Sequence, residues 1–133
     1  MDEIEIVTGF VVKSKLERYA GFLRSAKSRR KFIEGLYHFN DFDPAVVVEL
    51  PPSLETSAGI LKELERRGAG RTCYIISTDA DLDQKTLDLS EAINEVFAVV
   101  EGTIVSCLPG RLAYYEGEAP KNRFILHRTG SAV

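Results

Sequence analysis

Three residues in the sequence have side chains suited to nucleophilic or general-base chemistry. Cys107 is a candidate nucleophile with His38 or His127 as its base, provided that a cation or a helix N-terminus stabilises the thiolate. His38 is followed by Asp41 and Asp43, and a histidine oriented by a carboxylate is a common general-base unit. Packing explains Cys107 and His38 better, because the cysteine lies in an apolar run and the histidine lies among aromatic residues at a predicted helix end.

Aspartates at alternate positions, Asp79, Asp81 and Asp83, have the spacing of the first three ligands of a calcium-binding loop. Gln84 replaces the glycine that such a loop needs, and Ser90 replaces its bidentate glutamate. The sequence therefore predicts no metal site of this kind and no cofactor. A solvated loop near a helix start explains the aspartates better, and a magnesium ion held together with a substrate phosphate is the alternative.

The distribution of charge along the sequence is uneven and points to a specific segment. Between Lys13 and Lys31 the chain carries eight basic residues and a single acid, Glu17, so this basic segment has a net charge of +7 in a chain of −3. Such asymmetry is typical either of a surface for an anionic partner, such as nucleic acid or an acidic protein, or of a seam against the protein's own carboxylates. The sequence leaves both explanations open. The candidates for binding within the segment are Arg24, Lys27, Arg29, Arg30 and Lys31.

A third set of candidates depends on the expected fold. In open α/β sheets, ligands bind beyond the carboxyl ends of parallel strands. Ser53, Asp79 and Cys107 follow or end apolar runs that we expect to be such strands. Ser53 also opens a predicted helix, whose free N–H groups suit an anion. This rim is the expected site if the protein is a small hydrolase or a phosphoryl-handling enzyme, and the sequence decides neither for nor against catalysis.

The elements that must position these residues alternate along the chain. Residues 4–12 are predicted to form a strand with a bulge at Gly9. Residues 15–38 carry helical spacing, as one bent helix or as two. Helical patterns also begin at Ser53 and Asp88, where a side chain can cap the first turn. Apolar runs without alternation are typical of strands buried on both faces, and they occupy residues 45–50, 72–77 and 103–108.

The end of the chain predicts a different kind of connection. Pro109-Gly110 has the residue types of a type II turn, and strands are expected at residues 111–116 and 123–128. Strands separated by helices are typical of parallel crossovers. We therefore expect an α/β fold with a single mixed sheet, whose parallel strands are joined by helices and which closes with an antiparallel meander. The predicted core contains Val46, Val48, Leu61, Leu64, Ile75, Ile76, Ile93, Phe97, Ile104 and Val105.

Length and composition describe an ordinary globular protein. The chain has 133 residues, of which 44% are hydrophobic and 28% are charged. We expect one domain over residues 1–133 with a frayed tail at 129–133. An acidic N-terminus and the lack of a run of about 20 apolar residues predict neither export nor a membrane span. Cys73 and Cys107 have no disulfide or metal spacing, so reduced thiols in the cytoplasm are expected.

Binding is the function that these observations favour. We expect a soluble domain that contacts an anionic partner through residues 13–31, and the strand-end enzyme is the alternative. A homodimer is a further expectation, in which the N-terminal strand pairs with a partner chain. Exposure of Tyr114 and Tyr115 on the closing hairpins would favour the same association.

Overall fold

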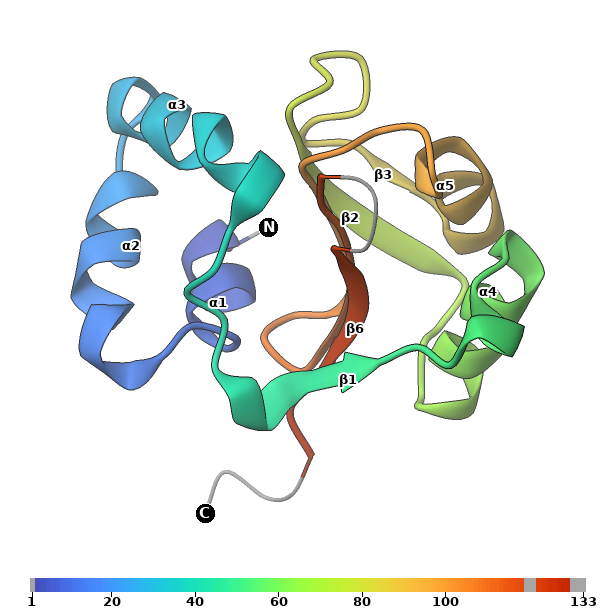
Figure 1. Ribbon diagram of the computed structural model, residues 1–133. Coiled ribbons are helices and arrows are strands. Elements are labelled where there is room, and N and C mark those ends of the chain that lie inside the picture. Colours follow the sequence, from blue (N-terminus) through green and yellow to red (C-terminus); the bar gives the residue numbers. More distant parts are fainter. Residues whose placement is uncertain (1, 119–121, 130–133) are drawn as a thin grey trace.

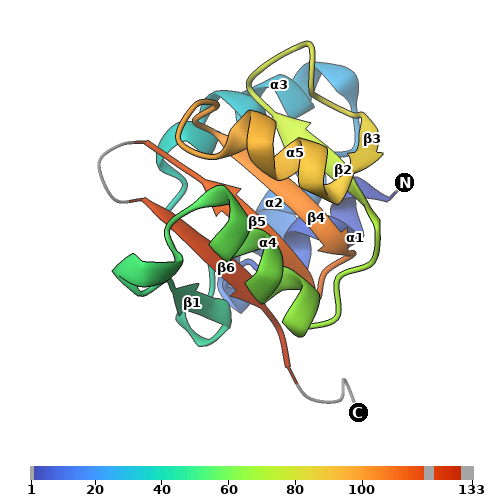
Figure 2. The same ribbon diagram turned by 90° about the vertical axis from the view of Figure 1, so that its right-hand side faces the viewer.

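The computed structural model describes residues 2–118 and 122–129, and it places one sheet between two layers of helices (Figure 1). The helices on one face are α1 (Glu3–Thr8), α2 (Leu16–Phe22) and α3 (Ala26–Glu34). The helices on the other face are α4 (Ser57–Arg66) and α5 (Leu89–Val96), which lie toward the viewer in Figure 2. No helix among the described residues is long and apolar enough to cross a membrane. The expected tail at 129–133 lies, apart from Thr129, outside the described residues.

The sheet has six strands in the spatial order β1-β6-β5-β4-β2-β3, and every pair of neighbours is antiparallel. The strands are β1 (Val47–Glu49), β2 (Thr72–Ser77), β3 (Thr86–Asp88), β4 (Thr103–Leu108), β5 (Leu112–Glu116) and β6 (Arg123–His127). β4, β5 and β6 form the expected antiparallel meander. At its first turn the Arg111 N–H donates to the Leu108 carbonyl oxygen at 2.9 Å, and Gly110 adopts a φ of +70°.

The expectation of parallel strands is wrong. Helices α4 and α5 do connect strands that run in the same direction, but those strands are not neighbours. β6, β5 and β4 lie between β1 and β2, and β2 lies between β3 and β4. The runs at 72–77 and 103–108 lack alternation because helices cover both faces of the sheet, which buries a strand whatever the direction of its neighbours. The three-residue strand β3 has no such run, and sequence reasoning misses it.

The N-terminal strand expected over residues 4–12 is also wrong, because most of this segment forms helix α1. The Asp2 carboxylate accepts hydrogen bonds from the N–H groups of Ile4 and Glu5, at 3.0 and 3.3 Å, and so caps the helix. Alternating Ile-Glu-Ile residues favour a strand locally, but six residues with a strong cap and a buried face are stable as a helix against the sheet. Tertiary packing therefore overrides the local pattern.

Close packing, and not a β-bulge, explains the glycine at position 9. A Cβ atom at Gly9 would lie 2.4 Å from the Cα atom of Gly110, so the end of α1 rests directly on the turn between β4 and β5. After α1 the chain makes a single antiparallel bridge, between Val11 and Phe42. The described N-terminal segment folds onto its own chain, and it offers no strand for the dimer that we expected.

The helical region at 15–38 consists of two helices rather than one. The hydroxyl of Ser25 accepts a hydrogen bond from the Ser28 N–H at 3.2 Å, so Ser25 caps α3. The Ser28 hydroxyl instead donates to the Phe22 carbonyl oxygen at 2.8 Å, which ties the start of α3 to the end of α2. This bond satisfies a carbonyl that the end of α2 leaves without a helical partner.

The predicted N-terminal cap is confirmed for α5 and is wrong for α4. The Asp88 carboxylate accepts a hydrogen bond from the Ser90 N–H at 3.0 Å, and it caps α5 as predicted. The cap of α4 is Thr56, whose hydroxyl accepts from the Gly59 N–H at 2.9 Å. Ser53 lies before it in a short 3-10 turn and makes no capping hydrogen bond. The expected helix start at Ser53 is therefore wrong by several residues.

Two hydrophobic clusters lie on opposite faces of the sheet. Consecutive residues of β5 show the division, since Tyr115 belongs to the cluster beneath α1–α3 and Tyr114 belongs to the cluster beneath α4 and α5. Both tyrosines are fully buried, so the expectation that they are exposed and favour a homodimer is wrong. Of the predicted core, Val48, Leu61 and Phe97 are partly buried. The buried members are Val46, Leu64, Ile75, Ile76, Ile93, Ile104 and Val105.

Candidate functional site

The antiparallel sheet separates the residues that were expected to share a strand-end rim. Ser77 at the end of β2 pairs with Thr103 at the start of β4. These two strands are antiparallel, so their carboxyl ends lie at opposite ends of the strand pair. Asp79 therefore follows one end of the sheet, whereas Cys107 lies near the other. Ser53 follows β1, which three strands separate from β2. The described residues do not assemble this rim, because strand direction separates Asp79 from Cys107 and strand order separates Ser53 from both.

Cys107 and His38 also lack the surroundings of a nucleophile and its base. The Cys107 side chain packs against the cluster beneath α4 and α5, where burial raises the pKa of its thiol. The thiol therefore stays protonated at neutral pH, and it is a poor nucleophile. The His38 side chain is 74% exposed, and its Nδ1 atom lies 3.3 Å from a carboxylate oxygen of Glu118.

The acidic loop after β2 is held by hydrogen bonds within the chain. The Asp79 carboxylate accepts from the Asp81 N–H at 2.8 Å, and the Asp83 carboxylate accepts from the Ser77 N–H at 2.9 Å. Within residues 2–118 and 122–129, no group of three or more His, Cys, Asp or Glu side chains is arranged to hold a metal ion. These carboxylates organise the loop and its approach to α3.

The basic segment divides into cations that are used inside the protein and cations that face solvent. Arg29 belongs to the first group, since its Nε atom donates to Glu3 at 2.7 Å and its Nη1 atom donates to Asp83 at 2.7 Å. Nη2 donates to the second oxygen of both carboxylates. The Arg29 side chain is only 13% exposed, and the hydrogen bonds to Asp83 are the main cause that raises its pKa. This Arg29 clamp, formed by Arg29, Glu3 and Asp83, joins α3 to α1 and to the loop after β2.

Asp41 is a second internal acceptor for the basic segment. Its carboxylate accepts a hydrogen bond from the Tyr19 hydroxyl and another from Lys15 Nζ at 3.1 Å. The Tyr19 hydrogen bond is the main cause that lowers the pKa of Asp41, so this carboxylate stays ionised. Arg24 lies 3.8 Å from Glu17 with both side chains exposed, and such a pair contributes only about 0–1 kcal/mol. Internal pairing therefore occupies some cations of the segment and leaves others available.

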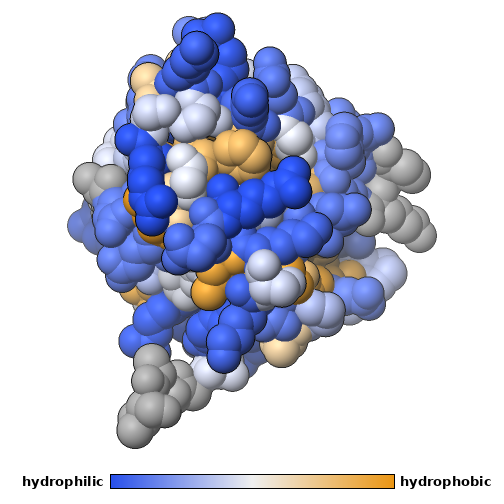
Figure 3. All heavy atoms as spheres, turned by 90° about the vertical axis from the view of Figure 1, so that its left-hand side faces the viewer, coloured by the Kyte–Doolittle hydropathy of each residue, from blue (hydrophilic) through white to orange (hydrophobic). Residues whose placement is uncertain are grey.

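Three of the predicted binding residues form a solvent-facing group on α3. Lys27, Arg30 and Lys31 are exposed, and none of them pairs with a carboxylate of the described chain. Figure 3 shows this side of the molecule, where hydrophilic side chains surround a smaller hydrophobic area. Arg29 is adjacent to these residues in sequence, but it points into the clamp. Sequence alone gives no means to separate them, because all four belong to one short helix.

A pocket of about 400 Å³ opens between α2, α3 and the chain that follows α3. We name it the cationic pocket, because Arg18 from α2 and Lys31 from α3 both line it, together with His38. The guanidinium carbon of Arg18 lies 5.7 Å from the centroid of the Phe22 ring, a cation–π arrangement. The other aromatic residues of the lining are Tyr19, Phe32 and Phe39.

The cationic pocket has the chemistry to bind an anion that carries a flat ring. Arg18 and Lys31 form no ion pair with a described carboxylate, and the one acid in the lining, Asp41, is already bonded to Tyr19 and Lys15. Arginine and lysine form charge-assisted hydrogen bonds with phosphates, and the partly exposed Phe22 ring offers a stacking surface beside the buried rings of the lining. Sequence reasoning misses Arg18 as a binding residue. Its spacing of four from Phe22 on a helix was the available signal.

Comparison with known proteins identifies no relative of this chain. It matches no protein-family model, no curated protein and no solved structure. Its function must therefore be inferred from the chemistry of the cationic pocket and of the surface around it.

Proposed function

We propose that this protein binds single-stranded nucleic acid through the cationic pocket and the exposed cations of α3. The observation that carries the proposal is the meeting of Arg18 and Lys31 with an aromatic lining in one pocket. A nucleic acid strand offers both matching groups, since its phosphates suit the cations and its bases suit the rings. Non-specific binders of single strands combine the same two features.

The charge around the cationic pocket supports the same ligand. Lys27 and Arg30 lie on the helix that carries Lys31, and they extend the positive surface beyond the pocket. An acidic protein surface would also neutralise these cations, but it would leave the aromatic lining without a partner. For this reason we favour nucleic acid over an acidic protein.

Binding of a labelled single-stranded oligonucleotide at several salt concentrations tests the proposal. For single strands, log K falls against log salt with a slope of about −0.7 for each phosphate that is neutralised. Replacing Arg18 and Lys31 together by alanine should therefore make the slope shallower by about 1.4. The loss of affinity should be greatest at low salt, where the phosphate contacts contribute most.

A matched double variant separates these contacts from general charge. Lys62→Ala with Arg71→Ala removes the same charge from exposed residues outside α2 and α3, and it should leave the slope unchanged. Absence of oligonucleotide binding at low salt, or an equal effect of both double variants, would refute the proposal. Binding of polyglutamate in place of the oligonucleotide would favour an acidic protein partner instead.

A further inference from the structure

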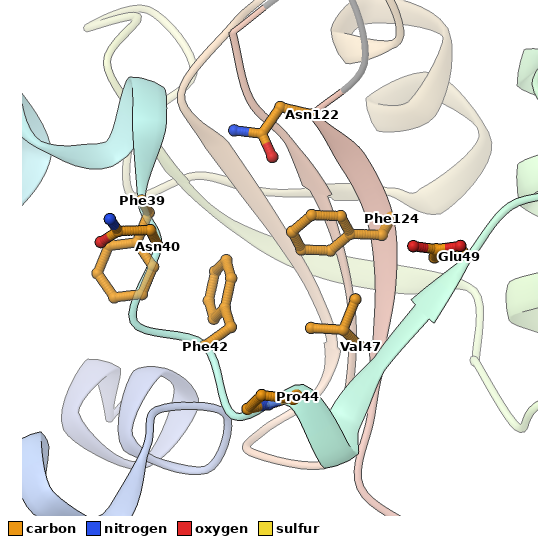
Figure 4. A pocket seen from close by; sticks show the side chains of 8 residues that line it. All are labelled: Phe39, Asn40, Phe42, Pro44, Val47, Glu49, Asn122 and Phe124. Carbon is orange, nitrogen blue, oxygen red and sulfur yellow. The ribbon is translucent and has the colours of Figure 1, made fainter.

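A second pocket, of about 470 Å³, lies beside the cationic pocket. Phe39 and Asn40 line both pockets, so they form a wall that the two share. Figure 4 shows the rings of Phe39, Phe42 and Phe124 around this second space, to which we refer as the aromatic pocket. Phe124 comes from β6, which lies next to the edge strand β1, whereas Phe39 and Phe42 come from the chain after α3.

The hydrophobic core holds these rings in place. The ring centroid of Phe42 lies 4.5 Å from that of Phe39 and 5.8 Å from that of Phe124. The buried Tyr115 ring contacts both Phe42 and Phe124, at 5.1 and 5.3 Å. Its hydroxyl donates to the Leu36 carbonyl oxygen at 2.5 Å. The aromatic pocket is therefore preformed, and a flat ligand can bind to it with little ordering of the protein.

Polar groups at the aromatic pocket suit an uncharged ring with hydrogen-bonding edges. Asn40 and Asn122 line it, and in Figure 4 both carboxamides lie beside the rings. A carboxamide offers both a donor and an acceptor, the combination that can pair with the edge of a base. Glu49 also lines the pocket, and its negative charge disfavours a phosphate there. The aromatic pocket thus suits an uncharged ring, whereas the cationic pocket also has the positive charges that a phosphate needs.

We infer that the aromatic pocket binds one base of a single strand whose neighbouring phosphate lies in the cationic pocket, an inference that rests on the proposed function. The shared wall of Phe39 and Asn40 places the two pockets side by side, as adjoining parts of one nucleotide chain require. A neutral sugar would also suit rings and amides, but it would leave Arg18 and Lys31 unused. Bases within a duplex are stacked and paired, so they cannot enter the pocket, and single strands should bind more tightly.

Oligothymidylate and an abasic strand with the same number of phosphates provide the test. Because stacking contributes about 1–3 kcal/mol per base, the protein should bind oligothymidylate roughly 5- to 150-fold more tightly than the abasic strand. Phe124→Leu keeps most of the apolar volume but removes the ring, and it should abolish most of this ratio. Its affinity for the abasic strand should not change. Asn122→Ala should reduce the ratio in the same direction, and it serves if the Phe124 variant does not fold.

Phe97→Leu is the matched control, because Phe97 is another partly buried phenylalanine but packs beneath α4 and α5. This variant should keep the full ratio between the two strands. The double variant of Arg18 and Lys31 should weaken both strands alike. Equal affinity of the unaltered protein for both strands would overturn the base-binding inference and leave the proposed function intact.

Failure of the proposed function leads to a different result, because neither strand would then bind. Titration with uncharged thymidine tests the aromatic pocket in that case. Shifts of the side-chain amide NMR signals of Asn40 and Asn122 that disappear in Phe124→Leu would support base binding by this pocket. No shift at millimolar thymidine, or shifts with a neutral oligosaccharide alone, would overturn it.

Discussion

The two helical layers cover opposite faces of one sheet, but they pack against it with different side chains. Beneath α1, α2 and α3, aromatic rings contact one another from Tyr19 through Phe39 and Phe42 to Tyr115. Beneath α4 and α5 the cluster consists mainly of aliphatic residues from the two helices and the strands. Both pockets that we assign to nucleic acid lie on the side with the rings.

This difference links packing to binding. Aromatic rings at the margin of a cluster offer flat faces on which a ligand can stack, whereas branched aliphatic side chains offer none. Phe39 shows the consequence, since its ring is buried in the cluster and yet forms part of both pockets. A core built from rings can therefore present its own edge to a ligand, and an aliphatic core of the same size does not offer that surface.

The Arg29 clamp is the feature whose loss should disturb the α1–α3 layer most. Arg29→Met removes a cation that both Glu3 and Asp83 contact, and it leaves two largely buried carboxylates without an opposite charge. We expect the free energy of unfolding to fall by about 3 kcal/mol, as for other buried ion pairs that lose one partner. Urea unfolding followed by circular dichroism measures the change.

Arg30→Met provides the control for the clamp, because Arg30 is the next residue and is exposed. Its effect should be within about 0.5 kcal/mol, as is usual for surface positions. Similar losses for the two variants would show that the clamp does not join the helices as we describe.

The adjacent tyrosines of β5 compare the two faces directly. The Tyr114 hydroxyl donates to the buried Glu116 carboxylate, whereas the Tyr115 hydroxyl donates to the neutral Leu36 carbonyl and accepts from the Phe39 N–H. Hydrogen bonds to charged groups contribute more than neutral ones. Tyr114→Phe loses one hydrogen bond to a charged group and Tyr115→Phe loses two neutral ones, so we expect each variant to cost about 2 kcal/mol in the free energy of unfolding.

Chemical denaturation of both variants beside Tyr37→Phe measures these costs. Tyr37 is exposed, so removal of its hydroxyl should change stability very little. A loss as small as that of Tyr37→Phe for either variant would show that its hydroxyl does not stabilise its face of the sheet as we describe.

The smallest expected effect is a loss of stability at low pH that arises from Glu63 on α4. A hydrogen bond from Arg66, supported by one from Arg67, lowers the pKa of Glu63 from 4.5 to about 2. A lowered pKa in the folded state means that the unfolded chain binds the proton more readily. The stabilisation by Glu63 is therefore complete above pH 4.5 and is lost as the pH falls toward 2.

Glu63→Gln should remove this dependence at a cost near neutral pH of about 1 kcal/mol or less, because the pair with Arg66 is at the surface. Stability measured between pH 2 and 7 should fall less steeply for the variant than for the unaltered protein. An unchanged slope would assign the acid sensitivity to other carboxylates, with Asp41 on the opposite layer as the next to examine.

Local chemistry was sufficient for several elements of this fold. Asp88 caps α5, Pro109 and Gly110 form the turn between β4 and β5, and the meander follows from that turn and the strands after it. These features depend on residues within a few positions of one another, so the sequence contains their physical cause. The positive charge of the basic segment can also be determined from the sequence alone, and Lys31 does line the cationic pocket.

Long-range contacts determine the remaining features. Arg29 and Lys31 have the same charge and lie two residues apart, but Arg29 bonds with carboxylates 26 and 54 positions away, and this distinguishes a structural cation from an available one. Strand direction likewise depends on which strands lie between those that a helix connects. Helical and strand periodicities record which side of an element is buried and carry no information about the neighbour that buries it. The order of the strands and the shared wall at Phe39 therefore arise only when the whole chain has packed.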